Sequence, residues 1–172
     1  MSGAQRESAA DRAAGGRLFP SQRGRWRYEV RAVTSAPPTV VWPLIGEAAS
    51  WKDWSFLTRT FLLRDGSPVP DGVGALRRFA VGPFGSCEEV VEFEPPSHLG
   101  YVVRKGLPVH SYRSDIVLRS HGNGTAITWT GSLEPLLPGT GRAVLAFTRG
   151  CVRLFARELV RHADRIAGQA PA

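Results

Sequence analysis

The segment Arg142–Ile166 reads RAVLAFTRGCVRLFARELVRHADRI, and it decides the fold that we predict for the whole chain. Its apolar residues recur at spacings of three and four, which is the pattern of a helix with one buried face. That face would carry Val144, Cys151, Leu154, Phe155, Leu159, Ala163 and Ile166. The opposite face would carry Arg149, Arg153, Arg157, Arg161 and Arg165. Pro138 and Gly139 stand just before the segment, where a helix start is expected.

The chain before this helix reads as short strands separated by turn residues. The first strand, Arg25–Thr34, alternates Tyr28 and Val30 with charged residues, which is typical of one buried and one wet face. Two short helices are expected next, one after Pro38 and one over Glu47–Trp54. Six further strands are predicted at Phe56–Arg64, Gly74–Val81, Ser86–Glu94, Leu99–Lys105, His110–Arg119 and Thr125–Leu133.

This order predicts the fold class and the domain organisation. Sequential antiparallel hairpins followed by one helix indicate an α+β protein, in which a curved seven-stranded antiparallel sheet wraps around the long C-terminal helix. A chain of 172 residues is most simply one domain, which we place at residues 25–166. Residues 1–22 are small and polar without periodicity, so we expect a disordered tail there, and a short C-terminal tail at 167–172.

Charge and composition narrow the function classes. The formal charge of +7 is carried by residues 1–27 and by the last helix, because each holds six basic and two acidic residues. We favour solvated arginines over a surface for anionic lipid, and we expect no nucleic-acid partner. No apolar run reaches the roughly 18 residues of a membrane span, and no secretory signal is seen. Cys87 and Cys151 have no framework spacing, which indicates reduced thiols in a cytoplasmic protein.

Several short motifs occur in an order that resembles a known superfamily. They are Ala36-Pro37-Pro38 with Val41-Trp42, Trp51 with Trp54, Gly72–Arg77, Glu88–Pro96, Tyr101, Gly106–Val109 and Gly124–Trp129. Over about Trp26–Ile166 the chain resembles the START-like, or Bet v 1-like (SRPBCC), superfamily, and within it the bacterial polyketide cyclase/dehydrase and lipid-transport group. The resemblance implies a helix-grip fold with a cavity for an apolar small molecule between sheet and helix, and it implies no single catalytic motif.

Strand alternation selects the side chains that would line such a cavity. The candidates are Trp54, Phe79, Glu89, Val91, Tyr101, Val103, His110, Tyr112, Ser114, Ile116, Ile127, Trp129, Cys151, Phe155 and Leu159. Ser114 is expected to stand beside open space, whereas Arg113, Asp115 and Arg119 on the same strand are expected to face water.

Four residues are candidates for acid or base chemistry: His110, Glu89, Arg77 and Tyr112. Antiparallel pairing would place Arg77 opposite Glu89, as a buried carboxylate tuned by an arginine. A self-satisfied ion pair, or a one-residue slip that sends both side chains to solvent, would remove that role. The four histidines are scattered and no nucleotide fingerprint is present, so neither a metal nor a cofactor is expected.

Three functions remain after this reading. The favoured one is a carrier or sequestering protein for a lipid, a polyketide or an aromatic metabolite, acting as a monomer or weak dimer. The second is an enzyme of the polyketide cyclase or dehydratase type, which would use one acid or base in a shaped pocket. The third is a module that contacts a membrane or an acidic partner through the arginine face of the last helix.

Overall fold

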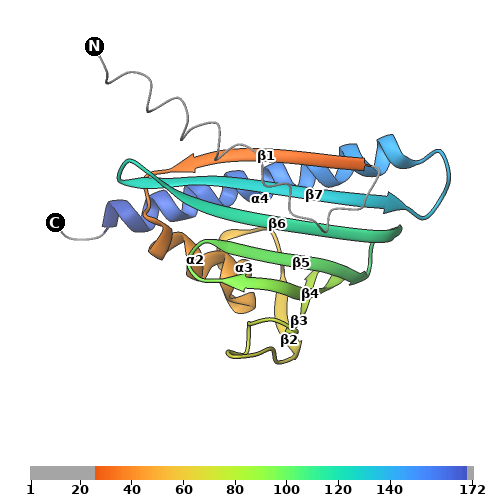
Figure 1. The fold of residues 1–172 in the computed structure, drawn as a ribbon, viewed down its shortest axis with the longest axis horizontal. Coiled ribbons are helices and arrows are strands. Elements are labelled where there is room, and N and C mark those ends of the chain that lie inside the picture. The colour runs from red at the N-terminus through yellow and green to blue at the C-terminus, as the bar shows by residue number, and fades with distance from the viewer. Residues whose placement is uncertain (1–25, 170–172) are drawn as a thin grey trace, which may run out of the picture.

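A computed structural model describes residues 26–169, which form one curved sheet with its helices on one side (Figure 1). The elements are β1 (Trp26–Thr34), α2 (Pro38–Gly46), the 3-10 turn η1 (Ala48–Ser50), α3 (Trp51–Trp54), β2 (Arg59–Arg64), β3 (Leu76–Val81), β4 (Phe84–Glu94), β5 (His98–Lys105), β6 (Val109–His121), β7 (Gly124–Pro135) and α4 (Gly141–Gln169). The tail expected at 1–22 lies outside the described residues, as do residues 170–172. Residues 167–169, expected in the C-terminal tail, continue α4.

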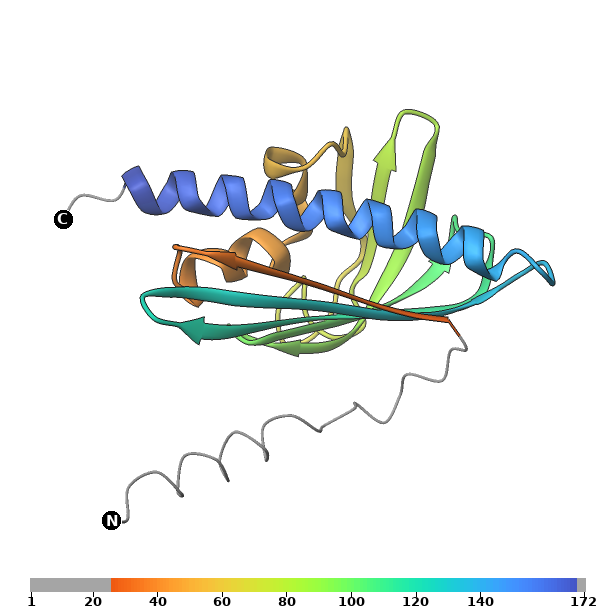
Figure 2. The same ribbon diagram turned by 90° about the horizontal axis from the view of Figure 1, so that it is seen from above.

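The sheet confirms the predicted fold class. Its seven strands lie in the order β1-β7-β6-β5-β4-β3-β2, and every neighbouring pair is antiparallel. The first strand, β1, pairs with the last strand, β7, and it forms one edge of the sheet. Figure 2 shows that the β3–β4 hairpin turns toward the side that carries α4. The architecture is therefore an α+β helix grip. Among the described residues, no helix is long and apolar enough to cross a membrane.

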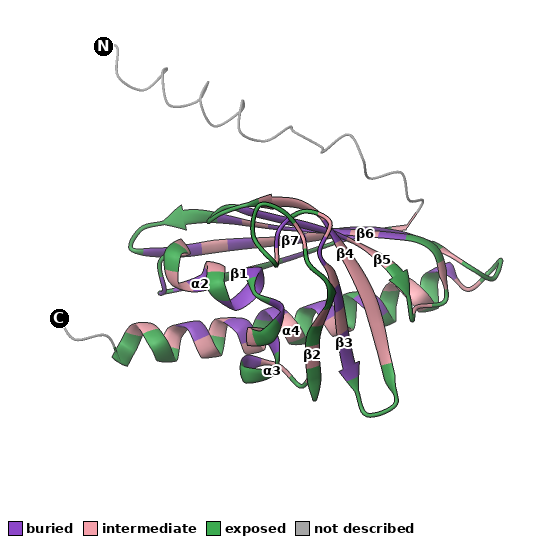
Figure 3. Cartoon of the chain, turned by 90° about the horizontal axis from the view of Figure 1, so that it is seen from below, coloured by how far each residue is buried: buried purple, intermediate pink, exposed green. Residues whose placement is uncertain are grey.

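The long helix packs unevenly on the sheet. Its closest packing is on β1, and it also approaches β7 and α2. The residues that it buries are Gly141, Thr148, Val152, Ala156, Leu159 and Ala163. Most are small, so the helix backbone can approach the sheet closely. Leu154 and Ile166 were expected on this face but are 43% and 36% exposed, because the buried face is centred on Val152 and Leu159. Figure 3 shows buried and exposed residues alternating along α4.

The C-terminal end of α2 is held by three side chains from elsewhere in the chain. The last carbonyls of a helix have no partner inside the helix. Here the indole of Trp54 donates to Leu44 O (2.8 Å) and that of Trp51 donates to Ile45 O (3.0 Å). The guanidinium of Arg77 on β3 donates to Ile45 O and to Gly46 O. These bonds anchor α2 and α3 to the β3 end of the sheet.

A β-bulge in β4 changes which of its residues face the helices. The register with β5 shifts at two places: between Cys87 and Glu88 the extra residue, Arg104, lies on β5, whereas between Val90 and Glu92 the extra residue, Val91, lies on β4. Only the bulge at Val91 reverses the alternation along β4. The inner residues before it are Ser86, Glu88 and Val90, although Phe93 beyond it faces inward as expected. The predicted inner set of Cys87, Glu89 and Val91 is wrong for this reason.

Asp115 on β6 does not face water as expected, because it is completely buried. Its carboxylate accepts bonds from Arg113 Nη2 (2.8 Å) and lies 3.0 Å from His98 Nε2. Gly100 on the neighbouring strand leaves room for it, since a Cβ there would lie 2.9 Å from Asp115 Oδ1. The outer face of the sheet thus carries a buried polar cluster that strand alternation alone does not predict.

Gly131 on β7 allows Tyr28 of β1 to lie across the inner face. The two residues pair directly in the ladder, and a Cβ at position 131 would overlap the tyrosine ring. With only hydrogen there, the Tyr28 hydroxyl reaches Tyr112 OH (2.5 Å) and Ser114 Oγ (3.1 Å) on β6. The missing side chain on β7 is therefore what lets β1 and β6 make contact across it.

We predict that Gly131→Ala lowers the free energy of unfolding by about 2 kcal/mol, because Tyr28 must move and its buried hydrogen bonds are lost. Urea unfolding followed by tryptophan fluorescence measures the change. Gly150→Ala is the matched control, since a Cβ there meets nothing within 4 Å in α4. That control should gain about 0.5–1 kcal/mol from helix propensity. A neutral Gly131→Ala would show that Tyr28 is not held in this way.

Candidate functional site

Five polar side chains meet on the inner face of the sheet, below the helices. Tyr28 OH bonds to Tyr112 OH and to Ser114 Oγ, as described above. The indole of Trp129 donates to Ser114 Oγ (2.9 Å) and lies 3.3 Å from Tyr101 OH. Ser114 in turn donates to the carbonyl of Thr130 (2.8 Å). All five side chains are buried, so they form one connected network in the core.

The tyrosines of this network stay protonated. Burial raises the pKa of Tyr28, Tyr101 and Tyr112 well above the ordinary value, and the neighbouring tyrosines and Glu88 raise it further. Phenols held in this way are hydrogen-bond donors and acceptors at any physiological pH.

Glu88 is the acidic group on this face. It pairs with Arg77 on β3 and with Val103 on β5, and Ser86 Oγ donates to its Oε1 (2.9 Å). The residue as a whole is half-buried, and its carboxyl is deeply enclosed by protein. Burial raises the pKa of Glu88 to about 7, while Ser86 and Arg77 act in the opposite direction. Glu88 is thus a carboxyl poised to exchange a proton near neutral pH.

Glu89, the carboxylate predicted for this role, lies on the opposite face. It forms ion pairs with Arg104 (2.6 Å) and Arg64 (2.9 Å) among largely exposed side chains. The hydrogen bond from Arg104 lowers its pKa, with further help from Arg64. Arg77 pairs with Glu88 in the ladder and Leu76 pairs with Glu89, so the expected pairing is wrong by one residue. The turn at residues 82–83 sets this register, because Val81 pairs with Phe84 and the ladder runs unbroken from there to Leu76 and Glu89. The bulge at Val91 explains the wrong face, since alternation counted back from Phe93 puts Glu89 inward.

Arg77, whose direction the sequence left open, faces inward, and only 2% of it is exposed. Besides the α2 carbonyls, its Nη2 donates to Asp71 O (2.9 Å) and lies 3.4 Å from Asp71 Oδ1. Its Nε–H has no hydrogen-bond partner, and no other described side chain has a buried nitrogen or oxygen in that state. Burial lowers the pKa of Arg77, while Asp71 and Glu88 raise it. A buried donor without an acceptor lowers the stability of the fold, so the Nε–H of Arg77 is available to an acceptor from outside the chain.

His110, expected to face the cavity near a strand end, does not lie on the inner face. It is exposed near the start of β6, where a register shift separates Val109 from Ser111. Alternation therefore brings Tyr112 inward but leaves His110 at the rim. Ser114 is also not beside open space, because it is fully buried and makes three hydrogen bonds.

The remaining predicted lining residues fall into two groups. Those that are packed in the core are Trp54, Phe79, Ile116, Ile127, Trp129 and Leu159. Those that are half-buried are Val91, Val103, Cys151 and Phe155. Val103 from β5 and Phe155 from the flank of α4 belong to inward-facing positions yet keep accessible surface. The helix α4 thus packs on β1 and approaches β7, whereas Val103 on β5 and Glu88 on β4 are only half-buried.

Aromatic rings from α3, β3, β7 and α4 form one cluster on the inner face. Phe155 contacts Trp51 (5.7 Å between ring centroids), Trp54 (6.1 Å) and Trp129 (6.2 Å). Trp51 also contacts Phe79 on β3 (5.0 Å). Such rings supply large apolar surfaces with defined geometry.

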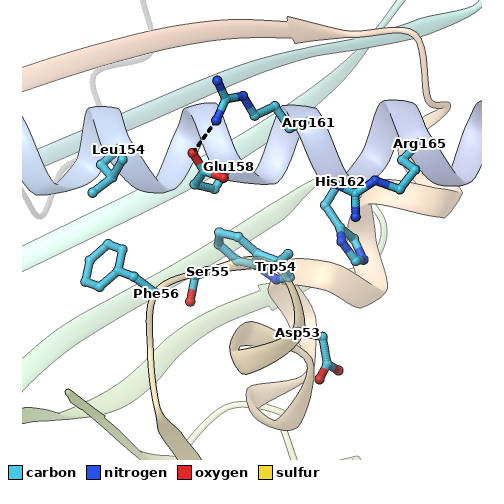
Figure 4. A pocket seen from close by; sticks show the side chains of 9 residues that line it. All are labelled: Asp53, Trp54, Ser55, Phe56, Leu154, Glu158, Arg161, His162 and Arg165. Atoms are coloured by element: carbon cyan, nitrogen blue, oxygen red, sulfur yellow. Dashed lines mark hydrogen bonds and ion pairs between the residues drawn. The ribbon is translucent and has the colours of Figure 1, made fainter. Parts of the chain in front are cut away.

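A surface groove of about 420 Å³ lies between α3 and α4 (Figure 4). It is lined by Asp53, Trp54, Ser55, Phe56, Leu154, Glu158, Arg161, His162 and Arg165. Phe56 stacks on Phe155 (4.6 Å between centroids), so two rings separate the groove from the inner face. Its walls mix charges of both signs, and Arg161 already pairs with Glu158 (2.9 Å). The buried tyrosines and Glu88, whose pKa values are raised by burial, lie on the inner face instead, which we take as the candidate site.

Metal ligands gather at one place among the described residues, on the outer face. Glu92, Glu94 and His98 bring their ligand atoms within 4.8 Å of one another. Arg113 also contacts Glu92 (3.3 Å), and a guanidinium there opposes a cation. The candidate site on the inner face contains no such group.

Tyr28 and Glu88 are the site residues that the sequence analysis did not select. Tyr28 was placed on an inner strand face by alternation, but its reach to β6 depends on Gly131. Glu88 was assigned to the wrong face because a bulge leaves no clear mark in a single sequence.

We predict that Glu88→Gln makes the stability of the protein less sensitive to pH. Between pH 4.5 and about 7 the unfolded chain loses this proton while the folded chain keeps it, so stability falls as pH rises through that window. The variant should therefore be more stable above pH 7, by on the order of 1–3 kcal/mol, and similar to the parent below pH 4.5. Thermal melting across pH 4–8 tests this. Glu89→Gln, whose carboxyl has a lowered pKa, should show no such gain.

Comparisons with known proteins agree with this geometry. Residues 25–166 match the family model described as polyketide cyclase / dehydrase and lipid transport. No curated protein matches the chain. Among solved structures, XoxI from Bacillus cereus is similar at 17% identity, with a TM-score of 0.68 over 83% of this chain and 98% of that one. A START superfamily protein from Mycobacterium smegmatis is similar at 11% identity, with a TM-score of 0.70 over 82% and 99%.

At these identities the solved structures establish the fold alone. The family model spans most of the chain and the whole of the described sheet and almost all of α4. The chain therefore belongs to the polyketide cyclase / dehydrase and lipid transport family.

Proposed function

We propose that this protein binds an apolar small molecule between the curved sheet and α4, as a carrier or sequestering protein. The observation that carries the proposal is the uneven position of α4, which packs on β1 and β7. Over β4 and β5 the inward-facing Val103 and Glu88 keep accessible surface, as does Phe155 on the helix flank. An apolar wall with a few polar groups at its deep end is what a small-molecule site needs.

The ligand class follows from the walls. Phe155 and Val103 are apolar, and the Trp129, Tyr101 and Ser114 network lies at the deep end. A lipid, a polyketide or an aromatic metabolite would meet both surfaces, and the family description names lipid transport and polyketide chemistry. Cys87 and Cys151 are free thiols, which supports a reducing compartment such as the cytoplasm.

An enzyme of the polyketide cyclase or dehydratase type is the second candidate, and Glu88 is the observation that favours it. A carboxyl whose pKa is about 7 suits a general acid or base at neutral pH. Glu88 replaces the earlier candidates Glu89 and His110, which lie off this face. Loss of product formation in Glu88→Gln with unchanged ligand binding would support this candidate over a carrier.

We predict that Val103→Trp weakens binding of the neutral fluorescent probe N-phenyl-1-naphthylamine at least tenfold. The indole would occupy the space that the probe needs, while the melting temperature should change by only a few degrees. Val102→Trp is the matched control, because Val102 is the preceding residue of β5 and pairs with Glu89 on the outer face. It should leave probe binding unchanged.

Two results would contradict the proposal. If the parent protein does not bind the probe and Val103→Trp unfolds it, the inner face is a packed core, since overpacking typically costs about 1–3 kcal/mol. If both tryptophan variants weaken binding equally, the probe binds elsewhere. Native mass spectrometry of the purified protein gives an independent readout, since it detects a small molecule that copurifies with the chain.

A further inference from the structure

Three residues lie in one row across the open half of the inner face. Strand register pairs Arg77 on β3 with Glu88 on β4, and Glu88 with Val103 on β5. A cation and a carboxyl are thus neighbours next to the half-buried wall where the proposed ligand would lie. A buried charge without a partner is destabilising, so an ion pair between the two would be expected.

Arg77 and Glu88 form no ion pair, although each has a group that could take part in one. The guanidinium is drawn toward the end of α2, where Ile45, Gly46 and Asp71 accept its Nη groups. Its Nε–H stays without a partner at a position that is 98% buried. Glu88 instead takes a hydrogen bond from Ser86 on its own strand. The Nε–H of Arg77 therefore has no acceptor, and the carboxyl of Glu88, on the neighbouring strand, has no ion pair with Arg77.

We propose that Arg77 and Glu88 form the polar end of the binding site and together bind the hydroxyl group of a phenol or an enol. The ligand oxygen accepts the Nε–H of Arg77, and the ligand O–H donates to a carboxylate oxygen of Glu88. This inference rests on the proposed function, because it names the polar group of the apolar molecule bound there.

A hydroxyl fits the pair better than the other common oxygen groups. A carboxylate would satisfy Arg77 but would be repelled by ionised Glu88. A ketone could accept from Arg77 but could not donate to a carboxylate. A hydroxyl can accept from Arg77 and donate to Glu88. The phenols of Tyr101 and Tyr112 already form hydrogen bonds within their own network.

The affinity for a ligand hydroxyl should depend on pH through the charge of Glu88 alone. The titratable groups near it are Arg77 on β3, Tyr101 on β5, Tyr112 on β6 and Tyr28 on β1. Burial raises the tyrosine pKa values well above the ordinary range, and a guanidinium stays charged. Cys151 on the α4 flank has a raised pKa as well. Between pH 5.5 and 8, only Glu88 changes its charge among these groups, from largely protonated to largely ionised.

The test compares 2-naphthol with naphthalene, which has the same ring system without the hydroxyl. At pH 8 the parent protein should bind 2-naphthol at least tenfold more tightly, as expected for hydrogen bonds to charged partners. At pH 5.5 the ratio should fall to about twofold, because Glu88 then holds its own proton. Isothermal titration calorimetry measures both affinities, and this pH comparison needs no variant.

Glu88→Gln should give the low ratio at both pH values, with naphthalene affinity unchanged. Glu89→Gln is the matched control on the outer face and should behave as the parent protein does. Melting curves of both variants verify that each is folded. Rescue of the ratio in Glu88→Asp would be incomplete, because the shorter side chain moves the carboxyl away from the ligand oxygen.

Each remaining outcome decides between the two proposals. Equal binding of naphthalene and 2-naphthol at pH 8 overturns the inference and leaves the proposed function standing. A preference for 2-naphthol that grows as pH falls also overturns it, since it would indicate that the naphthol oxygen accepts a hydrogen bond from protonated Glu88 instead of donating to the carboxylate. If neither compound binds at either pH, the proposed function fails, and the inference fails with it.

Discussion

The close packing of α4 on β1 and β7 is the constraint on which the rest of the structure depends. It is set by small helix residues, Ala156 and Ala163, together with Val152 and Leu159 at the contact. Close approach on one side of a curved sheet leaves a wider separation on the other side, because a straight helix cannot follow the curve. The half of the concave face over β4 and β5 is therefore less completely covered than the half over β1 and β7.

The polar interior is arranged around the same asymmetry. On the packed side, Tyr28 crosses Gly131 to join Tyr112 and Ser114, and every member of that network is bonded. On the open side, Arg77 is committed to the end of α2 and keeps one unmet donor, while Glu88 is buried near it with a raised pKa. A fully bonded network stabilises the fold, whereas an unmet donor next to a titrating acid is available for a ligand.

Burial has opposite consequences for the two neighbouring glutamates of β4. Glu89 lies among exposed arginines, which lower its pKa, whereas the carboxyl of the half-buried Glu88 is enclosed by protein and its pKa rises. Two adjacent glutamates thus lie on opposite faces of the sheet and have pKa values shifted in opposite directions. A single bulge decides which of the two carboxylates can meet a ligand.

The sequence by itself determined the elements, their order and the fold class, because hydrophobic periodicity and turn residues are local signals. It also placed Tyr101, Tyr112, Trp129 and Phe79 inward, since their strands keep a regular alternation. Only the tertiary structure decided between Glu88 and Glu89, the exposure of His110 and the burial of Asp115. Bulges and polar partners on neighbouring strands govern those positions, and neither appears as a periodic pattern in one chain. The end of α2, which binds Arg77 and leaves its Nε–H unmet, is likewise a long-range contact that no local pattern encodes.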